Sequence, residues 1–133
     1  ILDSESAKAC LSQTNAAGLM VGRGAIGRPS VFGEIKVGLG WMEEESLPWI
    51  AAHDGDWNNL SDVGKQFATR RWCWNRYIEL ARETTGLELK SMRGHAVSFT
   101  KGLPSAKKIR NIMHGKTSKE EFATATSEFL ASN

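Results

Sequence analysis

The chain has 133 residues, enough for one domain or for a small domain with part of another. Its charge is near balance, with 17 Lys and Arg against 15 Asp and Glu. It has no run of about 18 apolar residues, no signal-peptide pattern and no paired-cysteine motif, which argues against a membrane span, a disulfide framework and a metal site. Its two cysteines, Cys10 and Cys73, lie far apart, which fits a reduced, cytoplasmic setting.

Charge is distributed unevenly along the chain. Residues 42–64 carry six acids and no Lys or Arg, whereas residues 65–117 carry 12 Lys and Arg and three acids. Aromatic residues are interleaved with this basic block, a pattern that favours a phosphate-backbone partner such as a nucleic acid. The alternative interpretation is an ordinary solvated helix face.

The first forty residues are predicted to alternate helix, strand and helix. A helix can begin at Ser4 and end near Asn15, where Asn is a reasonable stop. The apolar stretch AGLMVG, residues 17–22, is typical of a short strand in a parallel sheet covered on both faces. Pro29 suits the start of a second helix, which ends at Gly38. This alternation is typical of an α/β protein.

Between the predicted strand and second helix lies a glycine loop, in the stretch GLMVGRGAIGRPSVF. Gly22, Gly24 and Gly27 formally make G-x-G-x-x-G, but a dinucleotide fold needs a second strand ending in an acid. No strand precedes the acids at 43–45, so that interpretation is weak. A second interpretation is a phosphate cradle, in which backbone N–H groups at Gly22 and Gly24 and the side chain of Arg23 contact an anion. A third is a tight turn that lets helix and strand pack closely.

Residues 41–59 are acidic and rich in tryptophan, and they read as an irregular connection. Trp41, Trp49 and Trp57 are too many aromatics for a disordered tether, so we expect them to pack. Residues 60–133 are predicted to form a bundle of four helices. Ser61 caps the first and Gly86 ends it, and the rest lie over residues 87–101, from Pro104 to Gly115, and from the Ser118 capping box onward.

The first bundle helix contains an aromatic and basic stretch, KQFATRRWCWNRYIELAR. Helical spacing predicts that four apolar side chains form a stripe facing the bundle and that Arg70 and Arg71 lie mainly outside this stripe. Trp72 and Arg76 share one face and could stack on a base or a ribose. Alternatively, Trp72 packs on the α/β part with arginine over it. Cys73 has no nameable catalytic partner and is best interpreted as a buried small hydrophobe. The four apolar side chains are Phe67, Trp74, Ile78 and Ala81.

Two stretches of the chain, AGLMVGRGAIGRPSVF and MRGHAVSFTKGLPSAKKIRNIM, together resemble one known family, the flavin-dependent tRNA-dihydrouridine synthases. AGLMVGRGAIGRPSVF resembles the family's last barrel strand and phosphate loop, roughly D-G-V-M-I-G-R-G-A-x-G-N-P-W-x-F. MRGHAVSFTKGLPSAKKIRNIM resembles its helical domain, roughly R-K-H-x-x-x-Y-x-K-G-L-P-G-A-x-x-x-R. The resemblance covers most of the chain apart from the connection at residues 41–59.

This resemblance implies both a fold and an activity. Residues 1–40 would be the last helix–strand–helix of a TIM barrel, followed by the connection at 41–59 and a helical tRNA-binding domain at 60–133. An isolated chain of this kind would be mostly helical. The parent protein would be a cytoplasmic oxidoreductase that reduces uridine to 5,6-dihydrouridine in tRNA. It would use FMN as cofactor and NADPH as reductant, with no metal and no membrane partner.

Candidate site residues follow from the same resemblance. Gly22 and Arg23 match the family's Gly-Arg pair that contacts the FMN phosphate, and Gly24 lies in the same loop. Arg93 and His95 match its Arg-Lys-His element. The remaining tRNA contacts are expected from basic side chains of the helical part, which are Arg70, Arg71, Lys101, Lys107, Lys108 and Arg110.

The chain also departs from the family pattern. Gly94 replaces a usual Lys, Phe99 a usual Tyr, and Arg28 a common Asn. The family's catalytic cysteine lies in an earlier barrel loop, and Cys10 and Cys73 match neither its motif nor its position. We therefore expect a C-terminal fragment of the enzyme, without a catalytic residue and inactive alone. The alternative is a non-catalytic helical module that binds RNA or another protein.

Overall fold

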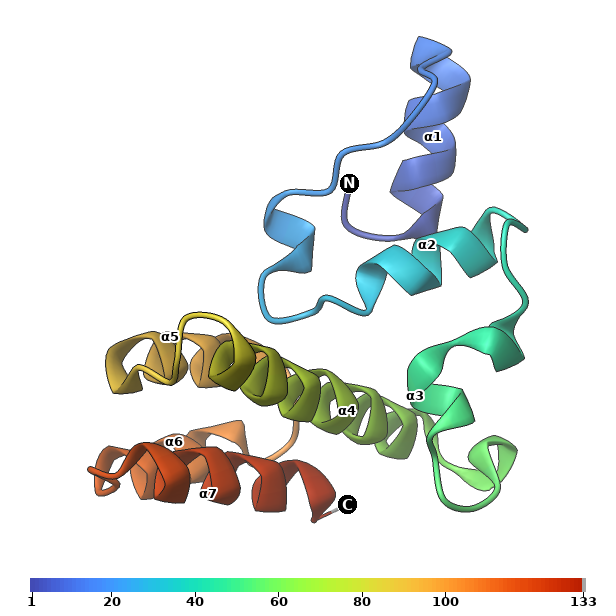
Figure 1. Ribbon diagram of the computed structural model, residues 1–133. Coiled ribbons are helices and arrows are strands. Elements are labelled where there is room, and N and C mark those ends of the chain that lie inside the picture. Colours follow the sequence, from blue (N-terminus) through green and yellow to red (C-terminus); the bar gives the residue numbers. More distant parts are fainter. Residues whose placement is uncertain (133) are drawn as a thin grey trace.

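The computed structural model describes residues 1–132, which are mostly helical and form two units joined by a connection (Figure 1). The α-helices are α1 (Ser4–Thr14), α2 (Val31–Gly38), α3 (Pro48–Ala51), α4 (Asp62–Glu83), α5 (Leu89–Thr100), α6 (Ala106–His114) and α7 (Lys119–Ala131). Short 3-10 turns lie at Arg23–Ala25, Glu44–Ser46 and Trp57–Asn59. Helices α1 and α2 make one unit, and the long α4 lies against α5 and α7 in the other (Figure 1).

The first unit is a small apolar cluster between α1 and α2. Asp3 caps α1 by accepting from the Ser6 amide at 2.8 Å, and Asn15 ends the helix in the left-handed conformation at φ 52°. The sequence predicted that end at Asn15 correctly. The buried members of the cluster are Ala7, Val31 and Ile35, and the partly buried side chains around them are Ile1, Leu19, Val21, Ala25 and Leu39.

The strand predicted at residues 17–22 is not formed, since residues 1–132 contain no strand. A strand is held by backbone hydrogen bonds to a neighbouring strand, and this segment has no such neighbour within the described residues. Its side chains nevertheless alternate in burial. Leu19 and Val21 pack on the first cluster, whereas Met20 is 88% exposed. The helical part of the predicted fold is confirmed, and its α/β tail is not.

The connection packs through two of its three tryptophans. Trp49 is buried, and its ring centroid lies 6.1 Å from that of Trp72 on α4. Trp57 meets the His53 imidazole edge-on, at 5.5 Å between centroids. Trp41 remains 62% exposed, so the expectation that all three pack is wrong for Trp41.

The second unit has helix ends that agree closely with the sequence signals. Ser61 caps α4 by accepting from the Gly64 amide at 3.1 Å, and Gly86 adopts φ 80° just beyond its end. Ser118 accepts from the Glu121 amide at the start of α7. The sequence predicts these helix ends because each capping side chain and its backbone partner lie within a few residues of each other.

The core of the second unit is built around α4. Phe67, Trp74 and Ile78 are buried as predicted, and the Trp74 indole donates to the Ala123 carbonyl of α7 at 3.2 Å. Helices α5, α6 and α7 add apolar side chains to the same cluster, among them Met92, Phe99, Ile109, Met113, Phe122 and Leu130. This core holds the basic surfaces of α5 and α6 in fixed positions relative to α4.

Candidate phosphate loop and nucleic-acid interface

The glycine loop makes an open recess at one end of the first unit. Its lining residues, Ile1, Leu2, Gly22, Arg23 and Gly24, enclose about 520 Å³. Within residues 1–132, the amides of Gly22, Arg23 and Gly24 have no hydrogen-bond acceptor, and the exposed Arg23 has no ion-pair partner. Free amides next to an arginine can bind an anion such as a phosphate.

The three glycines of this loop have different surroundings. A methyl group at Gly22 would meet no atom within 4 Å, so this backbone borders open space. At Gly24 it would lie 2.6 Å from the Ile1 carbonyl oxygen. Gly27 has φ 69°, and a methyl group there would lie 2.5 Å from the Ser98 carbonyl oxygen of α5. Gly22 therefore leaves room for a ligand, whereas Gly27 allows the loop to touch the helical unit.

Arg70 joins the glycine loop to the helical unit. Its guanidinium nitrogen Nη1 donates to the Gly27 carbonyl at 3.0 Å and to the Phe99 carbonyl at 2.9 Å. Burial lowers the pKa of this arginine, and the nearby charge of Arg28 lowers it further. The structure thus places Arg70 in the seam between the two units, with hydrogen bonds to backbone carbonyls. Sequence reasoning missed this role because the residues involved are widely separated along the chain.

A hollow between α5 and α6 brings together two of the predicted RNA contacts. Arg93 and Arg110 line it with His114, and an exposed Val97 lies beside them. Arg93 donates to the Lys116 carbonyl at 3.2 Å, and Arg110 donates to a carbonyl of its own helix, so their partners are uncharged. Residues 89–116 contain seven Lys and Arg and no Asp or Glu. The positive charge of this surface is therefore uncompensated by acids from α5 or α6.

The other predicted RNA contacts are spread around the second unit. The exposed His95 packs edge-on against Tyr77, with 5.0 Å between ring centroids. Lys101 follows α5 and Lys107 lies on α6, both exposed. Lys108 lines a separate groove between α6 and α7.

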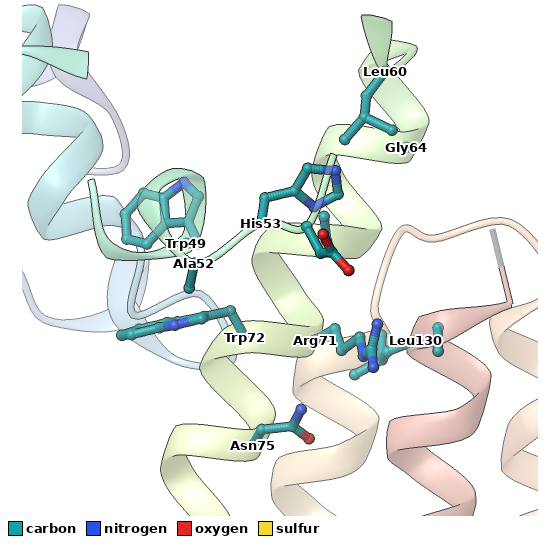
Figure 2. A pocket seen from close by; sticks show the side chains of 12 residues that line it. Trp49, Ala52, His53, Leu60, Gly64, Arg71, Trp72, Asn75 and Leu130 are labelled. Atoms are coloured by element: carbon teal, nitrogen blue, oxygen red, sulfur yellow. The ribbon is translucent and has the colours of Figure 1, made fainter. Parts of the chain in front are cut away.

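Arg71, the residue after Arg70 on α4, lies in a different recess, which is lined by aromatic side chains (Figure 2). This recess encloses about 340 Å³ between α3, α4 and α7. Trp49 and Trp72 line one end, with Asn75 one turn further along α4. Arg76 lies outside it and pairs with Glu79 at 2.5 Å. Trp72 therefore packs on Trp49 of the connection. Its partners predicted from the sequence, a nucleic acid or the α/β part, did not include the connection.

The two cysteines differ in exposure. Cys73 is 4% exposed, and burial raises the pKa of its thiol to about 11. A thiol of this kind is protonated and inert at neutral pH. Cys10 is half-buried on α1. The prediction that Cys73 is a buried small hydrophobe is confirmed.

No group of three His, Cys, Asp or Glu side chains within residues 1–132 is arranged to hold a metal ion. The helices described over this range are also too short or too polar to cross a membrane.

The structure defines a predominantly helical protein with a glycine loop joined to a basic helical unit. A family model described as dihydrouridine synthase (Dus) matches residues 1–133, which is the whole chain. The chain therefore belongs to the dihydrouridine synthase family. Members of this family are oxidoreductases that act on tRNA and generally use FMN. No solved structure gave a significant match to the chain.

Proposed function

We propose that this chain is the C-terminal part of a tRNA-dihydrouridine synthase, which reduces uridine to 5,6-dihydrouridine in tRNA with FMN and NADPH. In this proposal the glycine loop forms part of the FMN phosphate site, and residues 60–133 bind tRNA. The observation that carries the proposal is the family match over the whole chain. It is supported by the basic character of α5 and α6, since residues 89–116 contain seven Lys and Arg and no Asp or Glu.

The glycine loop fits one end of a flavin mononucleotide. The phosphate would accept hydrogen bonds from the free amides of Gly22, Arg23 and Gly24, and the Arg23 guanidinium would supply a charge-assisted contact. A methyl group at Gly22 would occupy the open space beside these amides, so glycine keeps the cradle accessible. Bound FMN would supply hydride transfer to the uracil ring. The chain's own contribution is to hold and orient the phosphate end.

Neither thiol of this chain is proposed as a proton donor to the uracil ring. Cys73 is enclosed by the core of the second unit and has a raised pKa. Cys10 lies on α1, and the glycine-loop recess is lined by other residues. The catalytic group would come from outside this chain, which would be inactive by itself.

Binding of tRNA is assigned to basic side chains of the second unit that are exposed or half-exposed. Arg93 and Arg110 are the strongest candidates because they share one hollow and lack acidic partners. His95, Lys101, Lys107 and Lys108 extend the positive surface of α5 and α6. Arg71 would contribute from the aromatic recess. Arg70 is instead proposed to position the glycine loop against the second unit, because it donates hydrogen bonds to the backbone carbonyls of Gly27 and Phe99.

The phosphate assignment can be tested by comparing FMN with riboflavin, which lacks the phosphate. We expect FMN to shift the amide resonances of Gly22, Arg23 and Gly24 in an NMR titration, and riboflavin to leave them in place. Arg23→Gln should weaken the FMN effect, whereas Lys36→Gln, which removes an exposed charge from α2, should not. Equal responses to the two flavins, or no response to FMN, would contradict the assignment.

The RNA assignment can be tested by charge removal in the hollow between α5 and α6. Arg93→Gln with Arg110→Gln should weaken tRNA binding in a fluorescence-anisotropy assay by about tenfold or more, because two phosphate contacts are lost. Lys8→Gln with Lys36→Gln removes the same charge from exposed positions of the first unit. Equal losses in both double variants would point to non-specific attraction. No loss in either would favour a protein-interaction module.

A further inference from the structure

A second polar pocket lies in the seam between the glycine loop and α4. It encloses about 390 Å³, and its volume is separate from the recess at Gly22–Gly24. Arg28, Ser30 and Glu34 line it from the start of α2, and Lys65, Thr69 and Arg70 line it from α4. The pocket thus joins side chains from both units of the fold.

The charges in this pocket do not balance. Its lining includes three cations, Arg28, Lys65 and Arg70, and one carboxylate, Glu34. Arg28 pairs with Glu34, whose other oxygen accepts from the Ser30 hydroxyl at 2.7 Å. The one carboxylate is therefore already engaged.

The other two cations have no acidic partner. Arg70 donates to three neutral backbone carbonyls, and Lys65 makes no ion pair within residues 1–132. Burial of the Arg70 guanidinium lowers its pKa, and the Arg28 charge adds to this effect. Arg28 and Arg70 repel each other, Glu34 offsets this only in part, and Lys65 adds a third positive charge to the lining, so an anion in the pocket would reduce the repulsion.

We propose that this seam pocket binds a phosphate group through Lys65, with the Arg28 and Arg70 charges stabilising the anion and Thr69 offering a hydroxyl donor. Tetrahedral phosphate suits such a site because it accepts several charge-assisted hydrogen bonds at once. The group could be a phosphodiester of the RNA backbone or a free phosphate. The RNA source rests on the proposed function, whereas binding of free phosphate does not.

The first experiment uses inorganic phosphate as the probe, at constant ionic strength maintained with chloride. We expect saturable NMR shifts at the amides of Ser30 and Thr69. Lys65→Gln should weaken the apparent affinity by about tenfold, the effect of one charge-assisted contact. Lys8→Gln should leave it unchanged, because Lys8 lies on the exposed face of α1. Absence of saturable shifts, or equal effects of the two variants, would overturn the proposal.

A second variant acts in the opposite direction. Glu34→Gln keeps the shape of the side chain and removes the one negative charge that lines the pocket. We expect it to bind phosphate more tightly than the wild-type chain, which a loss of folding could not produce. Unchanged or weaker affinity in a folded Glu34→Gln variant would count against an anion site.

The final arm identifies the source of the phosphate. If tRNA displaces inorganic phosphate from Ser30 and Thr69, and Lys65→Gln weakens tRNA binding, the seam binds the RNA backbone. If tRNA binds without displacing phosphate, the site takes free phosphate. If the chain binds no tRNA but the Lys65-dependent phosphate shifts persist, the seam site stands and the proposed tRNA function fails. The two proposals can therefore fail separately.

Discussion

Replacing Gly27 with alanine should weaken the contact between the two units of the fold. Gly27 has φ 69°, a left-handed conformation that costs an L-residue about 1–2 kcal/mol. The added methyl group would also lie 2.5 Å from the Ser98 carbonyl oxygen, which belongs to helical backbone and cannot simply rotate away. Overpacking of this kind typically costs about 1–3 kcal/mol. We therefore expect Gly27→Ala to lower the free energy of unfolding by about 2–5 kcal/mol.

Two other glycines separate these contributions in a urea-denaturation assay. Gly86 has φ 80° but no atom within 4 Å of an added methyl group, so Gly86→Ala measures the backbone cost alone, about 1 kcal/mol. Gly94 lies within α5, is exposed and has no atom within 4 Å of an added methyl group, so Gly94→Ala should not destabilise the chain. If Gly27→Ala costs no more than Gly86→Ala, the glycine loop does not pack on α5, and the reasoning is refuted.

Two further substitutions test the seam and the buried thiol. Arg70→Met leaves the Gly27 and Phe99 carbonyls without their donor, so the free energy of unfolding should fall by about 2 kcal/mol in urea denaturation, with partial recovery in Arg70→Lys. An unchanged urea midpoint would show that Arg70 does not join the units. Burial raises the pKa of Cys73 from 9.0 to about 11, so the unfolded thiol ionises first as pH rises, and stability should fall between those values by roughly 2–3 kcal/mol. Cys73→Ala should remove that part of the pH dependence, and an identical pH profile in the variant would contradict the burial of the thiol.

Local sequence signals predicted the helices well. Ser61 and Ser118 cap their helices by accepting hydrogen bonds from amides three residues further along, and Asn15 ends α1 in the left-handed conformation. Because these signals are local, the sequence predicts the starts of α4 and α7 and the end of α1. The spacing of Phe67, Trp74 and Ile78 likewise identified the buried face of α4.

The features that sequence reasoning missed depend on distant contacts. No local pattern distinguishes Arg70, which reaches Gly27 across the seam, from Arg71, which remains exposed in the aromatic recess. The segment at 17–22 has the composition of a strand, but pairing depends on a neighbouring strand that its own residues cannot supply. The G-x-G-x-x-G pattern likewise does not show that Gly22 borders open space whereas Gly27 lies against Ser98 of α5.

The salt dependence of tRNA binding tests the proposed RNA function most directly. Each phosphate contact releases counterions, so the logarithm of the binding constant should fall linearly with the logarithm of salt concentration. If four to seven of the basic side chains contact phosphates, the slope for the wild-type chain should be about −3 to −6, and Arg93→Gln should reduce its magnitude by about one. A slope near zero, or a slope unchanged by Arg93→Gln, would contradict the assignment of tRNA binding to the surface of α5 and α6.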